Sequence, residues 1–133
     1  SSNNNWRIAN LRYFNPIGSH PSGLIGESPL GDPNNIFPII TKVASRKLEV
    51  LKVFGDNWDT FDGTGVRDYI HVMDLADAHI SALKFIMNSS PILVNLNIGT
   101  GIGKSVLEVV ETFKKVNHCD FKYSFDSRKL NLN

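Results

Sequence analysis

Residues 62–76, DGTGVRDYIHVMDLA, place one arginine directly after a glycine-rich turn. Gly63 and Gly65 allow the backbone to bend tightly or to approach a ligand closely. The planar guanidinium of Arg67 matches the oxygens of a phosphate, so this spacing is typical of a site for an anionic ligand. An ordinary glycine-rich turn, with Arg67 paired to Asp68 or to another surface carboxylate, explains the same residues equally well.

Residues 99–105, GTGIGKS, end like a phosphate-binding loop but complete neither of the two nucleotide motifs. Ile98 stands where the phosphate loop needs its first glycine. The three glycines also lack the GxGxxG spacing of a dinucleotide-binding turn, because the third follows the second too soon. The segment therefore predicts a turn that leads from a strand into a helix.

Two polar clusters contain metal-binding residue types without the required spacing. The loop 56–62, DNWDTFD, lacks the alternating ligands of a calcium loop, so it predicts solvated carboxylates. His118 and Cys119 are adjacent, but no second pair follows at zinc spacing. For the remaining histidines the sequence shows no partner, and a local hydrogen bond is expected for each: His20, His71 and His79.

The elements that must position these residues include four predicted strands. Each is a short run rich in β-branched or aromatic side chains. The runs are residues 6–14, 48–54, 66–72 and 92–98. We expect the second and third runs to be neighbours in a sheet and the fourth to be buried. Between residues 16 and 33, several Gly and Pro residues predict a long irregular loop.

Three segments have the apolar spacing of a helix. The first follows Asn34 and Asn35, and asparagine is a suitable cap for a helix start. The second covers residues 75–86. The third begins at a capping-box pattern formed by Ser105 and Glu108. Together with the strands, these helices indicate an α/β arrangement with too few strands for a complete doubly wound fold.

Composition limits the partners that the chain can bind. Its 133 residues, 41% of them apolar, fit one globular domain. With 14 basic and 13 acidic residues, it lacks the charge for a broad surface that binds nucleic acid or an anionic membrane. The single cysteine, Cys119, excludes an intrachain disulfide, and neither a long apolar run nor a secretion signal is present. These features predict a cytoplasmic protein.

Five segments of the chain, taken in order, carry a family resemblance. They are LRYFNP at 11–16, NPIGSHPSGLIGE at 15–27, PNNIFP at 33–38, VFG at 53–55 and TGVRDYIHV at 64–72. They resemble the substrate-binding half of the UDP-galactose 4-epimerase family. The resemblance implies an α/β fold, the C-terminal part of a Rossmann-type extended short-chain dehydrogenase/reductase with its small substrate-binding domain. On this basis, residues 1–133 form a partial epimerase chain that lacks the N-terminal dinucleotide-binding region.

The resemblance also implies roles for individual residues. Tyr13 and Phe14 match positions near the nicotinamide end of bound NAD. Asn15 matches a residue that touches the UDP-sugar, and Arg67 matches the arginine on the diphosphate. Arg67 thereby becomes a specific candidate for binding a sugar nucleotide.

Seven further substrate contacts are implied by the same matching. They are Asn34, Asn35, Ile36, Lys52, Val53, Phe54 and Val106. The first three match a helix start on the substrate, where exposed N–H groups favour the diphosphate. The next three match a strand edge that borders uracil, and the last lines the nucleotide pocket. Plain structural roles remain open: an asparagine that only caps its helix, strand residues that belong to the core, and a valine that packs a helix.

The activity implied is the reversible inversion at C4 of the hexose in UDP-galactose and UDP-glucose, with NAD as cofactor. The resemblance further implies a homodimer for the complete enzyme. This family transfers the proton with a Tyr-x-x-x-Lys pair, yet none of Tyr13, Tyr69 and Tyr123 has a lysine four positions later. We therefore assign no catalytic residue and predict that the isolated chain is inactive.

Two alternative functions remain open. One is a catalytically incompetent module that holds UDP, a UDP-sugar or a protein partner. The other is a different nucleotide-sugar epimerase or dehydratase with the same substrate domain. In addition, parallel strands are normally covered on both faces, so we expect this chain alone to expose apolar surface and an unpaired strand edge.

Overall fold

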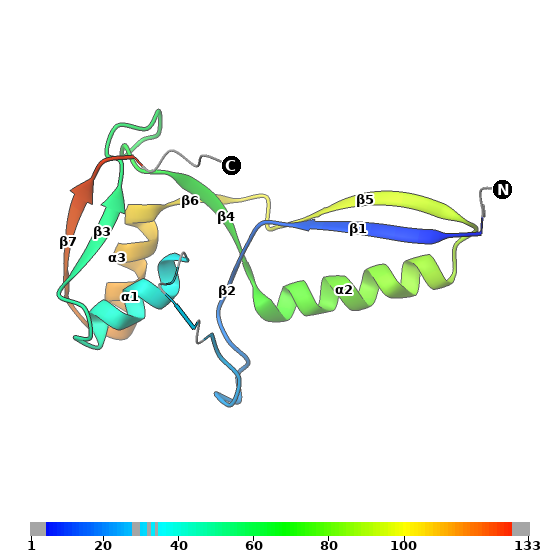
Figure 1. Ribbon diagram of the computed structural model, residues 1–133, viewed down its shortest axis with the longest axis horizontal. Helices are drawn as coiled ribbons and strands as arrows, with labels where there is room; N and C mark the ends of the chain where they lie inside the picture. The colour runs from blue at the N-terminus through cyan, green and yellow to red at the C-terminus, as the bar shows by residue number, and fades with distance from the viewer. Residues whose placement is uncertain (1–4, 28–29, 32, 34, 129–133) are drawn as a thin grey trace. The chain divides into compact units, whose positions relative to one another are not determined.

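The structure is a computed structural model that describes residues 5–27, 30–31, 33 and 35–128 (Figure 1). The elements are, in order, β1 (Arg7–Tyr13), β2 (Asn15–Ile17), α1 (Ile36–Ala44), β3 (Val50–Phe54), β4 (Val66–His71), α2 (Val72–Met87), β5 (Ile92–Ile98), β6 (Gly103–Ser105), α3 (Val106–Asn117) and β7 (Lys122–Asp126). The three predicted helices and four predicted strands are present, and β2, β6 and β7 are additional. Of the helices described, none is long and apolar enough to cross a membrane.

The contacts divide the chain into two units, whereas its length suggested one domain. Unit 1 consists of Ser1–Gly26 and Asp68–Ile102. Unit 2 consists of Glu27–Arg67 and Gly103–Asn133. The predicted site residues are therefore distributed over both units.

Unit 1 is built on the parallel pair β1 and β5, with α2 alongside (Figure 1). The side-chain amide of Asn10 donates to Asn95 Oδ1 across this pair at 3.0 Å. The imidazole of His71 caps α2 by accepting a hydrogen bond from the Met73 amide. The short β2 runs parallel to the second half of β4, with Asn15 opposite Tyr69.

The expected burial of β5 is wrong. Its side chains are exposed or half-buried, and Leu93 is 65% exposed. A parallel strand is buried only when both faces of its sheet are covered, and in the described part of the chain this sheet has just two strands. The expected apolar surface is accordingly present on unit 1, where Trp6, Phe85 and Met87 are also exposed.

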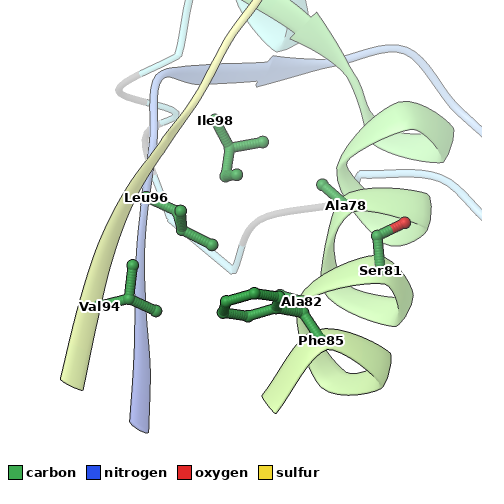
Figure 2. A pocket seen from close by; sticks show the side chains of 7 residues that line it. All are labelled: Ala78, Ser81, Ala82, Phe85, Val94, Leu96 and Ile98. Atoms are coloured by element: carbon green, nitrogen blue, oxygen red, sulfur yellow. The ribbon is translucent and has the colours of Figure 1, made fainter. Parts of the chain in front are cut away.

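An apolar groove of about 400 Å³ lies between α2 and β5. Figure 2 shows the β5 side chains pointing toward those of α2 across it. The lining residues are Ala78, Ser81, Ala82, Phe85, Val94, Leu96 and Ile98. None of the site residues predicted from the sequence lines this groove.

Unit 2 has its core between two helices and the parallel pair β3 and β7. The register runs from Val50 opposite Lys122 to Phe54 opposite Asp126. Alternate side chains of β3 are buried, as expected for a strand with one face on a core. The most buried apolar side chains of this unit are Ile40, Val43, Leu51, Val53, Val109 and Val110.

The prediction that β3 and β4 are sheet neighbours is wrong. β3 pairs with β7, and β4 is bonded to β2 and β6. A tight hairpin needs a connection of two to about five residues. Here the longer connection folds on itself, because the Trp58 amide donates to the Gly63 carbonyl at 2.9 Å. The Thr60 hydroxyl closes the same loop by donating to the Thr64 carbonyl at 2.7 Å.

Candidate functional site

Arg67 is the second residue of β4, and its side chain is exposed. Its Nη1 donates to the neighbouring Val66 carbonyl at 2.8 Å. The ion pairs found among the described residues do not include Arg67. In that part of the chain, the surface ion pair that could have explained Arg67 is therefore not observed.

Asp68, the nearest carboxylate to Arg67 along the chain, accepts hydrogen bonds from Thr100 and Gly101. Its Oδ1 accepts from the Thr100 amide at 3.0 Å and from the Thr100 hydroxyl at 2.7 Å. Its Oδ2 accepts from the Gly101 amide at 2.8 Å. The Thr100 hydroxyl, assisted by the two amides, holds the pKa of Asp68 below its ordinary value. Asp68 thus remains ionised and fixes the turn that follows β5.

Asp62 anchors the turn before Arg67 to the start of α3. Its Oδ1 accepts from the Thr64 amide at 2.9 Å and from the Thr64 hydroxyl at 2.7 Å, and its Oδ2 accepts from the Ser105 hydroxyl. Burial raises the pKa of Asp62, but the hydrogen bonds from Ser105 and Thr64 outweigh burial and hold the pKa below its ordinary value. The prediction of a solvated loop carboxylate is wrong for Asp62, because the loop folds back onto two fully buried hydroxyl groups.

The two glycines of this turn differ in what they contribute. Gly63 has φ +76°, and a side chain there would collide with the Asp56 carbonyl oxygen. Gly63 is therefore required by the loop itself. At Gly65, a Cβ would have no described atom within 4 Å, so local packing leaves room beside the backbone.

The start of α3 is occupied by the chain's own oxygen atoms. The predicted capping box is confirmed: the Glu108 amide donates to Ser105 Oγ at 3.1 Å, and the Ser105 amide donates to Glu108 Oε2 at 2.9 Å. The Val106 amide donates to the Gly65 carbonyl at 3.1 Å. Val106 itself is half-buried at the first position of the helix. This helix end therefore serves to hold the turn.

The start of α1 has a different arrangement. Asn35 stands at the N-cap position, but its side chain makes no capping hydrogen bond and instead donates to Glu27 Oε1 at 3.2 Å. The expected side-chain cap is thus wrong for Asn35, and Asn34 lies outside the described residues. Ile36, the first helical residue, is half-buried, and no acidic residue stands in the first turn. The positive end of this helix is consequently not neutralised by an acid of its own first turn.

The three strand residues proposed to border uracil lie on β3 with different exposures. Val53 is 2% exposed, so its side chain belongs to the core. Phe54 is half-buried at the end of the strand. Lys52 is exposed, and its Nζ lies 3.3 Å from Asp126 Oδ2 on β7. The Lys52 side chain is thus paired with Asp126 and the Val53 side chain is buried, so the proposed contact with a base would have to use their backbone groups.

The residues proposed to lie near NAD are found at the carboxyl end of β1 in unit 1. Tyr13 and Phe14 are 53% and 48% exposed. The Phe14 amide donates to the Ile98 carbonyl at 3.1 Å, and a Cβ at Gly99 would lie 2.5 Å from the Phe14 ring. Asn15 follows in β2 and is half-buried. The turn that Asp68 fixes therefore also packs against Phe14.

The histidines have the local roles that the sequence predicts. The Nδ1 atom of His20 bonds to Ser22, that of His71 accepts from the Met73 amide, and that of His79 bonds to the Leu75 carbonyl. No group of three potential metal ligands occurs among the residues that the structure describes.

Sequence reasoning missed the partners of Asp62 and Asp68. Both carboxylates bind the threonine of a Gly-Thr-Gly triplet, at residues 63–65 and 99–101. The repeated triplet could have predicted these turns from the sequence, because aspartate and threonine commonly stabilise turns by hydrogen bonds from their side chains to nearby backbone groups. It indicates two anchored turns, one on each side of Arg67 in the sequence.

Known proteins resemble the chain along most of its length. It is 53% identical to a UDP-glucose 4-epimerase of Bacillus subtilis over 129 residues, which cover 97% of this chain and 38% of the relative. A Dictyostelium discoideum protein of the same name is 49% identical with the same coverage. The chain therefore spans less than two fifths of the length of these relatives.

Solved structures agree with this similarity. A UDP-glucose 4-epimerase from Stenotrophomonas maltophila, with bound NAD and formylated UDP-arabinopyranose, superposes with a TM-score of 0.90 at 47% identity and covers 94% of this chain and 37% of its own. The Bifidobacterium longum enzyme, in complex with NAD+ and UDP, gives a TM-score of 0.90 at 44% identity, with 96% and 38% covered.

The resemblance inferred from sequence motifs is thereby confirmed, and so is the assignment to part of a Rossmann-type fold. The sequence pattern of one family matches residues 1–99, which is most of the chain. The chain belongs to the NAD dependent epimerase/dehydratase family.

Proposed function

We propose that this chain supplies substrate contacts to an NAD-dependent 4-epimerase that interconverts UDP-galactose and UDP-glucose. Several relatives of about 50% identity are named UDP-glucose 4-epimerases, which supports this activity for the whole protein. Because the chain spans less than two fifths of such proteins, its own contribution is the narrower one of holding substrate.

The exposed guanidinium of Arg67 is the observation that carries this proposal. It lies beside a turn fixed by Asp62, and both nearby aspartates already have hydroxyl and amide partners. A guanidinium in such surroundings binds a diphosphate without first breaking an ion pair with either of them. We assign Arg67 to the diphosphate of the UDP-sugar.

The helix start at α1 is proposed as a second diphosphate contact in unit 2. Asn35 and Ile36 stand there, and Asn34 precedes them. No acidic residue stands in the first turn of α1, which favours an anion there, but a phosphate at this helix start would have to displace Glu27 from the Asn35 side chain. The contrast with α3, whose first amides already have oxygen partners, makes α1 the better of the two helix starts for a phosphate.

The carboxyl end of β3 is proposed to hold the uracil base. Lys52 and Val53 would contribute backbone groups, since the first pairs with Asp126 and the second is buried. Phe54 would give an apolar contact from its half-buried ring. Val106, also half-buried, is assigned to the wall of the nucleotide pocket.

Unit 1 is proposed to contact the nicotinamide end of NAD. Tyr13 and Phe14 suit this role because they are half-exposed aromatic rings at the carboxyl end of a parallel strand, where ligands of open α/β sheets bind. The backbone amide of Phe14 also donates a hydrogen bond to the Ile98 carbonyl, which helps to hold this residue in place. Asn15 is assigned to the sugar. When bound, NAD supplies the acceptor and donor for the hydride at sugar C4.

Substrate selectivity tests the proposed binding function. Calorimetry with the pure chain should show binding of UDP, UDP-glucose and UDP-galactose, and much weaker binding of ADP-glucose. Equal affinity for the adenine and uracil nucleotides would contradict the assignment of β3 to uracil. With UDP-galactose and added NAD, the pure chain should show no turnover, because it lacks a recognisable Tyr-x-x-x-Lys pair. Measurable epimerisation would refute that part.

A protein-binding role is the second candidate, and the apolar groove of unit 1 favours it. We propose that the complete enzyme is a cytoplasmic homodimer and that this chain alone associates through exposed apolar surface. Size-exclusion chromatography, together with a separate assay of binding to a dye that reports apolar surface, tests whether the chain alone associates. A monomer that binds no dye would contradict it.

A further inference from the structure

Trp58 closes the end of β3. Its indole Nε1 donates to the Phe54 carbonyl at 3.4 Å. The next residue, Gly55, donates its amide to the Asp126 carbonyl of β7 at 2.9 Å. The last peptide groups of β3 are thus tied both to the following loop and to the neighbouring strand.

Arg128, which follows β7, lies over the Trp58 ring. Its guanidinium carbon lies 4.2 Å from the centroid of the Trp58 ring, a cation–π distance. Its Nη2 donates to the Asn57 carbonyl. The cation is therefore held by the loop of residues 55–58, and it connects the segment after β7 to that loop.

The packing of Trp58 and Arg128 against the end of β3 requires a glycine at position 55. The residue has φ +87°, a conformation that favours glycine. A Cβ there would lie 2.6 Å from Trp58 Nε1 and 2.8 Å from Arg128 Cγ. Only glycine allows the indole and the arginine stem to approach the strand end this closely. We call Gly55, Trp58 and Arg128 the latch.

We infer that Trp58 is a positioning residue for the uracil base, acting through the latch on the end of β3. This inference rests on the proposed function, which assigns that strand end to uracil. Backbone groups recognise a base only when they are held close to the required geometry. By bonding to the Phe54 carbonyl, the latch orders these groups before ligand arrives, which reduces the entropy lost on binding.

Separate ligands for the base and the diphosphate test this inference on the full chain. Trp58→Ala should weaken uridine and UDP binding by the same factor, about tenfold, and leave pyrophosphate binding unchanged. Arg67→Ala should do the reverse, weakening UDP and pyrophosphate while sparing uridine. Uridine affinities are measured by NMR titration and the others by calorimetry. Trp58→Tyr, which keeps a ring and a donor, should recover most of the affinity.

Milder variants and a matched control complete the design. Trp58→Phe keeps an aromatic ring but removes the donor, and Arg128→Gln removes the cation from an exposed position. Each should weaken uridine binding about threefold, with less than additive effects in the double variant. These two variants carry the test if Trp58→Ala does not fold. Phe61→Ala changes an 80% exposed aromatic of the same loop and should have no effect.

The outcomes separate the inference from the proposed function. If wild-type chain binds uridine and UDP but folded Trp58 variants bind them equally well, the latch has no positioning role. An equal loss of pyrophosphate affinity would likewise overturn the inference, since it indicates general damage to unit 2. Failure of the wild-type chain to bind either uracil ligand would overturn both the proposed function and the inference.

Discussion

The two Gly-Thr-Gly turns use the same chemistry in different surroundings. At residues 63–65 in unit 2, Asp62 binds Thr64 and Ser105, both of which are fully buried. At residues 99–101 in unit 1, Asp68 binds an exposed Thr100 and the Gly101 amide. The first carboxylate joins a loop to a helix start, and the second fixes a surface turn. Similar hydrogen bonds should therefore contribute more to stability in the buried turn than in the exposed one.

The largest effect is expected from Asp62→Ala. This change leaves two buried hydroxyl groups without their acceptor, and each unsatisfied buried group costs about 1–3 kcal/mol. We predict that the free energy of unfolding falls by about 2–4 kcal/mol, measured by urea denaturation. Asp59→Ala, an exposed aspartate of the same loop, is the matched control and should change stability by less than about 0.5 kcal/mol. A loss in Asp59→Ala as large as that in Asp62→Ala would show that the destabilisation does not come from the two buried hydroxyl groups.

Ser105→Ala should have the next largest effect. It removes a capping-box hydroxyl that accepts from the Glu108 amide and donates to Asp62. Loss of such a cap costs about 0.5–2 kcal/mol, and we expect a value in the upper half of that range because Ser105 is buried. In a double-mutant cycle with Asp62→Ala, the two losses should not add, because they share one hydrogen bond. Strict additivity would show that the two residues act independently.

Asp68→Asn should have a smaller and more local effect. Thr100 and Gly101 lie at the surface, where water replaces a lost acceptor. We predict a smaller global destabilisation than in Ser105→Ala, with faster hydrogen exchange at these two amides. Exchange measured by NMR should also change at Phe14, which packs against the same turn. Unchanged exchange at all three amides would show that Asp68 does not hold the turn.

Acid should weaken both turns in the same direction. The pKa of Asp62 and that of Asp68 lie below their ordinary values, so the stability they contribute is complete above about pH 4. That contribution is lost as the pH falls from there through the lower folded-state pKa values. Urea denaturation between pH 6 and pH 2.5 should show this decline, with a shallower slope in Asp62→Asn. An identical slope in that variant would exclude Asp62 as a source of the acid sensitivity.

The sequence predicted the elements well but predicted their partners poorly. Apolar periodicity and the Ser105–Glu108 pattern located α2 and α3, because these signals are local. The pairing of β3 with β7 joins segments about 70 residues apart, and no local signal encodes it. The candidate site residues came from the family resemblance of five motifs, and they stay predictions. Periodicity alone did not reveal that Asp62 and Asp68 were engaged elsewhere, since both bind partners more than 30 residues away.

The central claim is that Arg67 binds the diphosphate of a UDP-sugar, and calorimetry with UDP tests it most directly. Arg67→Ala should weaken binding by about tenfold to a hundredfold, or about 1.5–3 kcal/mol, because it removes charge-assisted hydrogen bonds to the diphosphate. Arg7→Ala, which changes an exposed arginine of β1, should leave the affinity unchanged. Unchanged UDP affinity in a folded Arg67→Ala chain would contradict the claim.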